Sequence, residues 1–209
     1  MALPHSKDIM KYPARFQFQP GAPCNGSSTC TDTCIQMVLE YYKDKTYSLS
    51  YIRNKAQSLS HFNEGPCTGI NYQEVLNALK LLGVDHYRVA WNVNASFVAK
   101  KTAIGPVMTG IYYGAYPNWK GHCGPIKAEI AGRTQCNFSG SHMVLALKKV
   151  YHVDHTDMFV RDPDHHSSSR PEHPDHDRIH YSQLDRAMKA LPTHTAFSRT
   201  YAIYPTKKK

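Results

Sequence analysis

Residues 30–43, with the sequence CTDTCIQMVLEYYK, carry a helical pattern that is apolar on two sides. One stripe at helical spacing consists of Ile35, Val38, Leu39 and Tyr42, and a second consists of Cys30, Cys34, Met37 and Tyr41. A helix that is apolar on both sides belongs in the middle of a domain and not on its surface. The remaining chain must therefore surround this helix, and 209 residues are enough for one full-size core.

The elements after this helix change from helical to extended periodicity. Two more helices are predicted over residues 48–59 and 71–82, because Ser48 and Asn71 can cap their starts and Gly83 can end the second. Extended patterns then predict strands over residues 87–91, 106–113, 143–150, 158–161 and 197–204, with a helical turn at 97–101, a tight turn at 154–157 and a short helix at 181–190. Helices first and strands later predict an α+β fold with a mostly antiparallel sheet.

Four segments lack this periodicity. Residues 1–29 are rich in Pro, Gly and Ser and indicate an irregular N-terminal arm, and residues 114–140 are Gly-rich and polar, as expected for a loop or insertion. A loop rich in His and Asp covers 162–180, and a basic tail covers 206–209. We therefore expect one domain over residues 30–205.

Composition and charge restrict which partners and which cellular locations are expected for the protein. No window approaches the roughly 20 apolar residues that cross a bilayer, and residues 1–18 lack the apolar core of a secretory signal. A soluble protein is expected, either cytoplasmic or incorporated in a virion or secreted assembly. The net charge of +9 favours an acidic macromolecular surface or a larger protein assembly as a partner. Nucleic acid is disfavoured, because no basic run is interleaved with aromatic residues.

Cys30, His142 and Asp162 are the candidate catalytic residues. Cys30 stands at the start of the buried helix, where the helix dipole stabilises a thiolate. A cysteine nucleophile needs a base, and the base needs an orienting group. His142 opens one predicted strand and Asp162 ends the next, so antiparallel pairing would bring them to the same end of the sheet.

Each of these signals also has an ordinary explanation. A lone cysteine at a helix start is usually a small buried hydrophobe, a histidine before a strand is usually a surface residue, and Asp-Pro is commonly a turn. Their order along the chain is what favours the catalytic interpretation.

The segment TCTDTCIQMVLEYY, residues 29–42, resembles the cysteine box of papain-like peptidases that cleave double-glycine leader peptides from bacteriocins. That box reads DCGxACxxMVxxYY, and its first cysteine is the nucleophile. Further similar segments are GINYQEVLNALKLLG at 69–83, IGPVM at 104–108, GSHMVL at 140–145 and VRDP at 160–163. The resemblance implies a papain-like fold over roughly residues 24–205, with the Cys-bearing helix packed on an antiparallel sheet. It makes Cys30 the nucleophile and Cys34 the structural second cysteine.

The sequence departs from this pattern around the nucleophile. Thr31 replaces the Gly that follows the family's nucleophile, and Thr29 replaces the preceding Asp. No Gln lies at the usual short distance before Cys30, so Asn25, or the more distant Gln19, is the candidate donor to the oxyanion.

Two functions from different classes follow. The first is a thiol peptidase or amidase that cuts a peptide or peptidoglycan cross-link through Cys30, His142 and Asp162 without a metal or organic cofactor. The second is a non-enzymatic structural or binding component, for example of a phage virion or a secretion machine, that reuses the peptidase fold.

Histidines outside the candidate triad are possible ligands for a metal ion. The density of His and acidic residues at 162–180 could bind Zn²⁺ or Ni²⁺, but no ligand spacing repeats and a solvated loop is favoured. His152 and His155 are expected to be exposed in the turn between two strands.

Overall fold

A computed structural model of the protein describes residues 15, 22–23, 28–58, 68–112, 115, 141–163, 177–194 and 199–209. The predicted insertion at 114–140, apart from Ala115, lies outside these residues, as do most of the arm and most of the His-rich segment. Asn25 and Gln19 also lie outside them.

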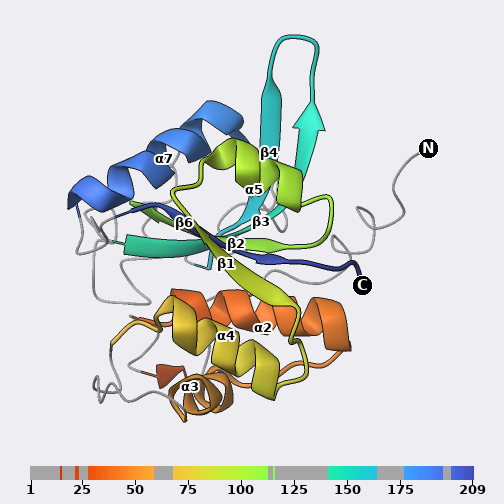
Figure 1. The fold of residues 1–209 in the computed structure, drawn as a ribbon, viewed down its shortest axis with the longest axis vertical. Coiled ribbons are helices and arrows are strands. Elements are labelled where there is room, and N and C mark those ends of the chain that lie inside the picture. The colour runs from red at the N-terminus through yellow and green to blue at the C-terminus, as the bar shows by residue number, and fades with distance from the viewer. Residues whose placement is uncertain are drawn as a thin grey trace, which may run out of the picture.

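Three helices gather on one face of a sheet (Figure 1): α2 (Cys30–Lys43), α3 (Leu49–Gln57) and α4 (Tyr72–Leu81). The predicted caps form, since Ser48 accepts a hydrogen bond from the backbone N–H of Tyr51 and Asn71 makes a capping box with Glu74. Gly83 follows α4 with a φ of 83°, the left-handed conformation that favours glycine. No helix among the described residues combines the length and apolar character needed to cross a membrane.

The sheet has six strands in the order β1-β6-β2-β3-β4-β5, and every neighbouring pair is antiparallel. The strands are β1 (Tyr87–Trp91), β2 (Val107–Tyr112), β3 (Ser141–Tyr151), β4 (Thr156–Arg161), β5 (Asp177–His180) and β6 (Tyr201–Pro205). Two more helices, α5 (Ala95–Lys101) and α7 (Tyr181–His194), cover the other face (Figure 1). The predicted α+β fold is confirmed.

The core occupies both faces of this sheet. Successive residues of β3 alternate between them: Met143, Leu145 and Leu147 pack with α2 and its neighbours, while Val144 and Ala146 pack with α5 and α7. Burial on both faces explains why this strand reads as a continuous apolar run. Eleven of the fourteen residues of α2 are buried, as its two apolar stripes predict. The β3–β4 hairpin projects beyond the body of the molecule (Figure 1).

Several predicted boundaries were wrong. Residues 177–180 form strand β5, although the whole stretch 162–180 was expected to be a loop. Ile179 of this strand is buried, and the pairing of the strand with β4 comes from the fold. Thr156 and Asp157 belong to β4 and not to the preceding turn. The last strand begins at Tyr201 instead of residue 197, and α7 continues to His194 beyond the expected end at residue 190.

Candidate active site

Cys30 is the first residue of α2 and is partly buried. The helix begins with the carbonyl of Thr29, which accepts hydrogen bonds from the backbone N–H of Thr33 at 2.9 Å and from its hydroxyl at 2.8 Å. The sulfur therefore lies where the partial positive charge of the helix N-terminus favours an anion. This is the position that the sequence predicted for a reactive thiol.

His142 and Asp162 meet at the same end of the sheet. His142 is the second residue of β3, and Asp162 directly follows β4, which runs antiparallel to β3. The His142 Nε2 atom lies 2.7 Å from Asp162 Oδ1, and both side chains are buried. The two residues thus have the geometry of a base and its orienting carboxylate.

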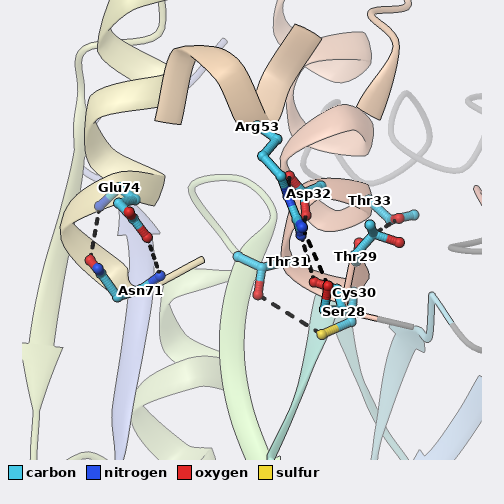
Figure 2. A network of polar contacts seen from close by, with 9 residues as sticks. All are labelled: Ser28, Thr29, Cys30, Thr31, Asp32, Thr33, Arg53, Asn71 and Glu74. Atoms are coloured by element: carbon cyan, nitrogen blue, oxygen red, sulfur yellow. Dashed lines mark hydrogen bonds and ion pairs between the residues drawn. The ribbon is translucent and has the colours of Figure 1, made fainter. Parts of the chain in front are cut away.

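The environment of Cys30 favours its thiolate. Burial opposes ionisation, but a hydrogen bond with His142 and the positive charge of the imidazolium outweigh it and lower the pKa of the thiol. The backbone N–H of Met143 and the hydroxyl of Thr31 act in the same direction. The Thr31 Oγ1 atom lies 3.9 Å from the sulfur, the contact drawn in Figure 2.

The environment of His142 favours its protonated form. Burial alone would lower the pKa of this imidazole, but the charge and hydrogen bond of Asp162 and the interaction with Cys30 raise it well above its ordinary value. Nε2 faces Asp162, so Nδ1 is the ring nitrogen that remains for Cys30. The two pKa shifts have opposite directions, and both favour negative charge on Cys30 and positive charge on His142.

Arg53, on α3, holds the start of α2 in place (Figure 2). Its Nη2 atom donates to the carbonyl of Ser28 at 2.7 Å and to Asp32 Oδ2 at 2.6 Å, and its Nε donates to Asp32 Oδ1 at 3.3 Å. Asp32 and Arg53 are both buried. One guanidinium thus binds the backbone carbonyl of Ser28 before Cys30 and the side chain of Asp32 after it.

Sequence reasoning missed this role of Arg53, although the pattern contained a signal. Arg53 falls on the same helical stripe as Leu49, Ile52 and Ala56, the buried side of α3. A charge on an apolar stripe needs a partner, and Asp32 is one of the two acidic residues of the neighbouring apolar helix, the other being Glu40. Burial raises the pKa of Asp32 to about 6, against the opposing effect of Arg53, so this carboxyl is mainly ionised at neutral pH.

Cys34 lies one turn after Cys30 and has a different environment. It is fully buried, and its thiol donates to the carbonyl of Met143 at 3.6 Å. Burial, with the negative charges of Cys30 and Asp162, raises the pKa of this thiol well above its ordinary value. Of these two cysteines, Cys30 is the one suited to nucleophilic attack.

The structure describes three of the five predicted site residues and brings these three together: Cys30, His142 and Asp162. Asn25 and Gln19, the predicted oxyanion donors, lie outside the described residues. Among the described residues, a group of side chains that could hold a metal ion lies on the β3–β4 hairpin, away from the triad.

No protein-family model matches the sequence, and no curated protein matches it significantly. Solved structures do match. The peptidase domain of Streptococcus ComA, a bifunctional ABC transporter involved in a quorum-sensing pathway, aligns with a TM-score of 0.50 at 12% identity, covering 94% of this chain and 99% of that domain. A C39-like peptidase from Bacillus anthracis aligns with a TM-score of 0.56 at 14% identity, covering 94% of this chain and 96% of that one.

These alignments span nearly the whole chain, and the two compared structures are described as a peptidase domain and a C39-like peptidase. At 12% and 14% identity they establish the fold, and they agree with the resemblance that the sequence segments indicate. The chain has the papain-like fold of C39-type cysteine peptidase domains.

Proposed function

We propose that the protein is a thiol peptidase or amidase that uses Cys30 as its nucleophile, His142 as its acid and base, and Asp162 as the group that orients the imidazole. The observation that carries this proposal is the buried contact of 2.7 Å between His142 and Asp162 beside a cysteine whose thiol pKa is lowered. A structural cysteine gains nothing from a charged imidazole held by a carboxylate, whereas a nucleophile requires both.

The chemistry follows from the thiolate–imidazolium pair. The Cys30 sulfur attacks the carbonyl carbon of the amide, forming a C–S bond, and the proton on His142 passes to the leaving nitrogen as the C–N bond breaks. Water then attacks the thioester while His142 removes one of its protons. The C–S bond breaks, the carboxylic acid leaves, and the released Cys30 thiolate with the proton that His142 took from water restores the pair.

The substrate class is a peptide or a peptidoglycan amide. Double-glycine peptides are included because the sequence resembles peptidases that cut after this motif. Each attack on the carbonyl carbon places negative charge on the carbonyl oxygen, and this oxyanion needs hydrogen-bond donors. The backbone N–H of Cys30, together with the side-chain amide of Asn25 or Gln19, is proposed for that role.

A second candidate function is that of a non-enzymatic component built on the same fold. One observation favours it: the hydroxyl of Thr31 contacts Cys30 at a position where the family pattern has Gly. A side chain there takes up space beside the nucleophile that an enzyme of this pattern leaves open. Under this alternative the protein has the peptidase fold but does not hydrolyse a substrate.

The test is hydrolysis of a panel that contains double-glycine peptides, unrelated peptides and peptidoglycan fragments. We expect turnover of at least one member, its loss in Cys30→Ala, and its retention in Cys34→Ala, with circular dichroism to show that both variants fold. Absence of turnover across the panel, or turnover that survives Cys30→Ala, would favour the non-enzymatic component.

A further inference from the structure

Two histidines and a buried aspartate converge at the tip of the projecting β3–β4 hairpin: His152 and His155 from the turn, and Asp157 from β4. One possible ligand atom from each residue lies within 4.8 Å of the others. The rings of the two histidines stack with centroids 4.4 Å apart, and the backbone N–H of His152 donates to the carbonyl of His155 at 2.8 Å. Both histidines are partly buried, although the sequence suggested exposure.

The distances suit a tetrahedral metal ion. His152 Nε2 lies 3.2 Å from Asp157 Oδ2, and His155 Nε2 lies 3.6 Å from Asp157 Oδ1. Two ligand atoms at about 2.0–2.1 Å from a tetrahedral zinc ion are roughly 3.3 Å apart. Small side-chain rotations would therefore place the two nitrogens and the carboxylate around one ion.

The hydrogen bonds also prepare His155 for such a role. Its Nδ1 lies 2.5 Å from Asp154 Oδ1, while its Nε2 faces Asp157. Metal-binding histidines typically donate the N–H of one nitrogen to a carboxylate and bind the ion with the other. A nitrogen that faces a carboxylate carries either a proton or a metal ion, so an ion would replace the proton between His155 and Asp157.

His180 is the nearest further histidine, because β5 pairs it with Asp157 and its ring stacks on His155 at 5.4 Å. Its Nδ1, however, accepts a hydrogen bond from the backbone N–H of Ser182 at 3.3 Å and lies 2.7 Å from the hydroxyl of the same residue. The second nitrogen of a neutral ring then carries the proton. His180 therefore flanks the group without serving as a ligand.

From this arrangement we propose that His152, His155 and Asp157 form a binding site for Zn²⁺, with water in the fourth position. Imidazole and carboxylate are zinc ligands, and three protein ligands with one open position are a known zinc arrangement. The site is separate from the triad: His142 and His152 stand near opposite ends of β3, which places them about 30 Å apart along the strand. The ion links the turn to β4 and holds the hairpin in one conformation.

The test is titration of the full chain with Zn²⁺ by calorimetry and with Co²⁺ by absorption spectroscopy. We expect one Zn²⁺ to bind at this site, a tetrahedral Co²⁺ spectrum without a thiolate charge-transfer band, and a rise in Tm of about 5–10 °C at a free Zn²⁺ concentration near a hundred times Kd. A spectrum with thiolate bands would assign the ion to a cysteine and overturn the proposal.

Variants separate this site from the other histidines. His152→Asn with His155→Asn should weaken Zn²⁺ binding at least 100-fold, and Asp157→Asn, which keeps the shape of the side chain, should weaken it at least 10-fold. His180→Asn is the matched control and should stay within about 3-fold of the parent. A fourth variant replaces His165, His166, His173 and His176 with Asn and should keep the site.

Two outcomes would contradict the proposal. If the fourth variant loses the ion while the double variant keeps it, the metal belongs to the His-rich segment. If His180→Asn weakens binding as much as the double variant does, the proposed ligand set is wrong. Should the double variant unfold, Asp157→Asn still decides the question.

Discussion

His142 Nε2 and Asp162 Oδ1 lie 2.7 Å apart in the protein interior, and this contact determines how the imidazole is used. An ionised Asp162 accepts a hydrogen bond from the Nε2–H group, which leaves Nδ1 as the ring nitrogen that can face Cys30. The same carboxylate raises the pKa of His142 well above its ordinary value, against the effect of burial. Asp162 thus both orients the ring and favours its charged form.

Replacing Asp162 should lower the rate of hydrolysis. The size of the loss should depend on whether the new side chain can accept the hydrogen bond from the Nε2–H group of His142. Asp162→Ala removes the acceptor, and we expect kcat to fall about 100- to 10,000-fold. Asp162→Asn offers an amide oxygen at the same place and should lose less. Steady-state kinetics of both variants on one substrate provides the measurement. Equal losses would mean that the charge, and not the hydrogen bond, is what matters.

The rate of Cys30 alkylation by iodoacetamide should reach its plateau at a lower pH than that of an ordinary thiol, whose pKa is near 8.5. The reason is the lowered pKa of Cys30, since the thiolate is the reacting form. As pH falls, the thiolate persists until the pH drops below the lowered pKa, so the alkylation rate stays high to a lower pH than it does for an ordinary thiol. Mass spectrometry of the labelled peptide distinguishes Cys30 from the other cysteines.

His142→Ala is the control for this titration. Burial raises the pKa of Cys30, and the charge and hydrogen bond of His142 are the main effects that reverse it. Without the imidazole, the midpoint should move up to the ordinary value or above it. A midpoint that stays low in His142→Ala would assign the effect to the helix N-terminus alone.

Arg53→Met should destabilise the protein by about 3–5 kcal/mol at pH 7, because it leaves the buried Asp32 carboxylate without its partner. The double variant Asp32→Asn with Arg53→Met should recover much of this loss, since no buried charge remains. Urea unfolding of the parent, the two single variants and the double variant gives the coupling free energy. Simple additivity of the two single changes would argue against the ion pair.

The pH dependence of the Arg53 effect provides a further check. The pKa of Asp32 is raised to about 6, so the folded state holds a proton on this carboxyl more readily than the unfolded state does. Its contribution to stability is therefore present near pH 4 and is lost as pH rises through about 6. Arg53→Met should consequently cost less at pH 5 than at pH 7, and Asp32→Asn should remove this difference.

The sequence predicted those helices and strands whose apolar periodicity and capping residues match the way they are buried in the fold. The two apolar stripes of residues 30–43 identified a central helix, and the caps at Ser48 and Asn71 marked the next two helix starts. β5 was missed because an edge strand of four residues, DRIH, that holds one apolar residue has almost no local pattern. Its pairing with β4 is a property of the whole fold.

At the candidate site, the order of Cys30, His142 and Asp162 along the chain was informative. In two adjacent antiparallel strands the start of the first lies beside the end of the second, so His142 and Asp162 meet at one end of the sheet. The role of Arg53 was not found, because it depends on how α3 crosses the start of α2. The group of His152, His155 and Asp157 was also missed as a unit. Asp157 was assigned to the turn, whereas its place in β4 directs the carboxylate at both imidazoles.

Asn25 and Gln19 provide a way to separate a reactive thiol from an enzyme. If Asn25 donates to the oxyanion, Asn25→Ala should lower kcat about 100- to 1000-fold, because the tetrahedral intermediate loses one hydrogen bond. The same change should leave Cys30 alkylation by iodoacetamide unaltered, since that reaction forms no oxyanion. Gln19→Ala is the matched variant for the second candidate, and the residue whose loss lowers kcat without altering alkylation is the donor. If neither change affects kcat, the oxyanion is held by other groups. A fall in alkylation together with kcat would instead show that the residue supports the Cys30–His142 pair.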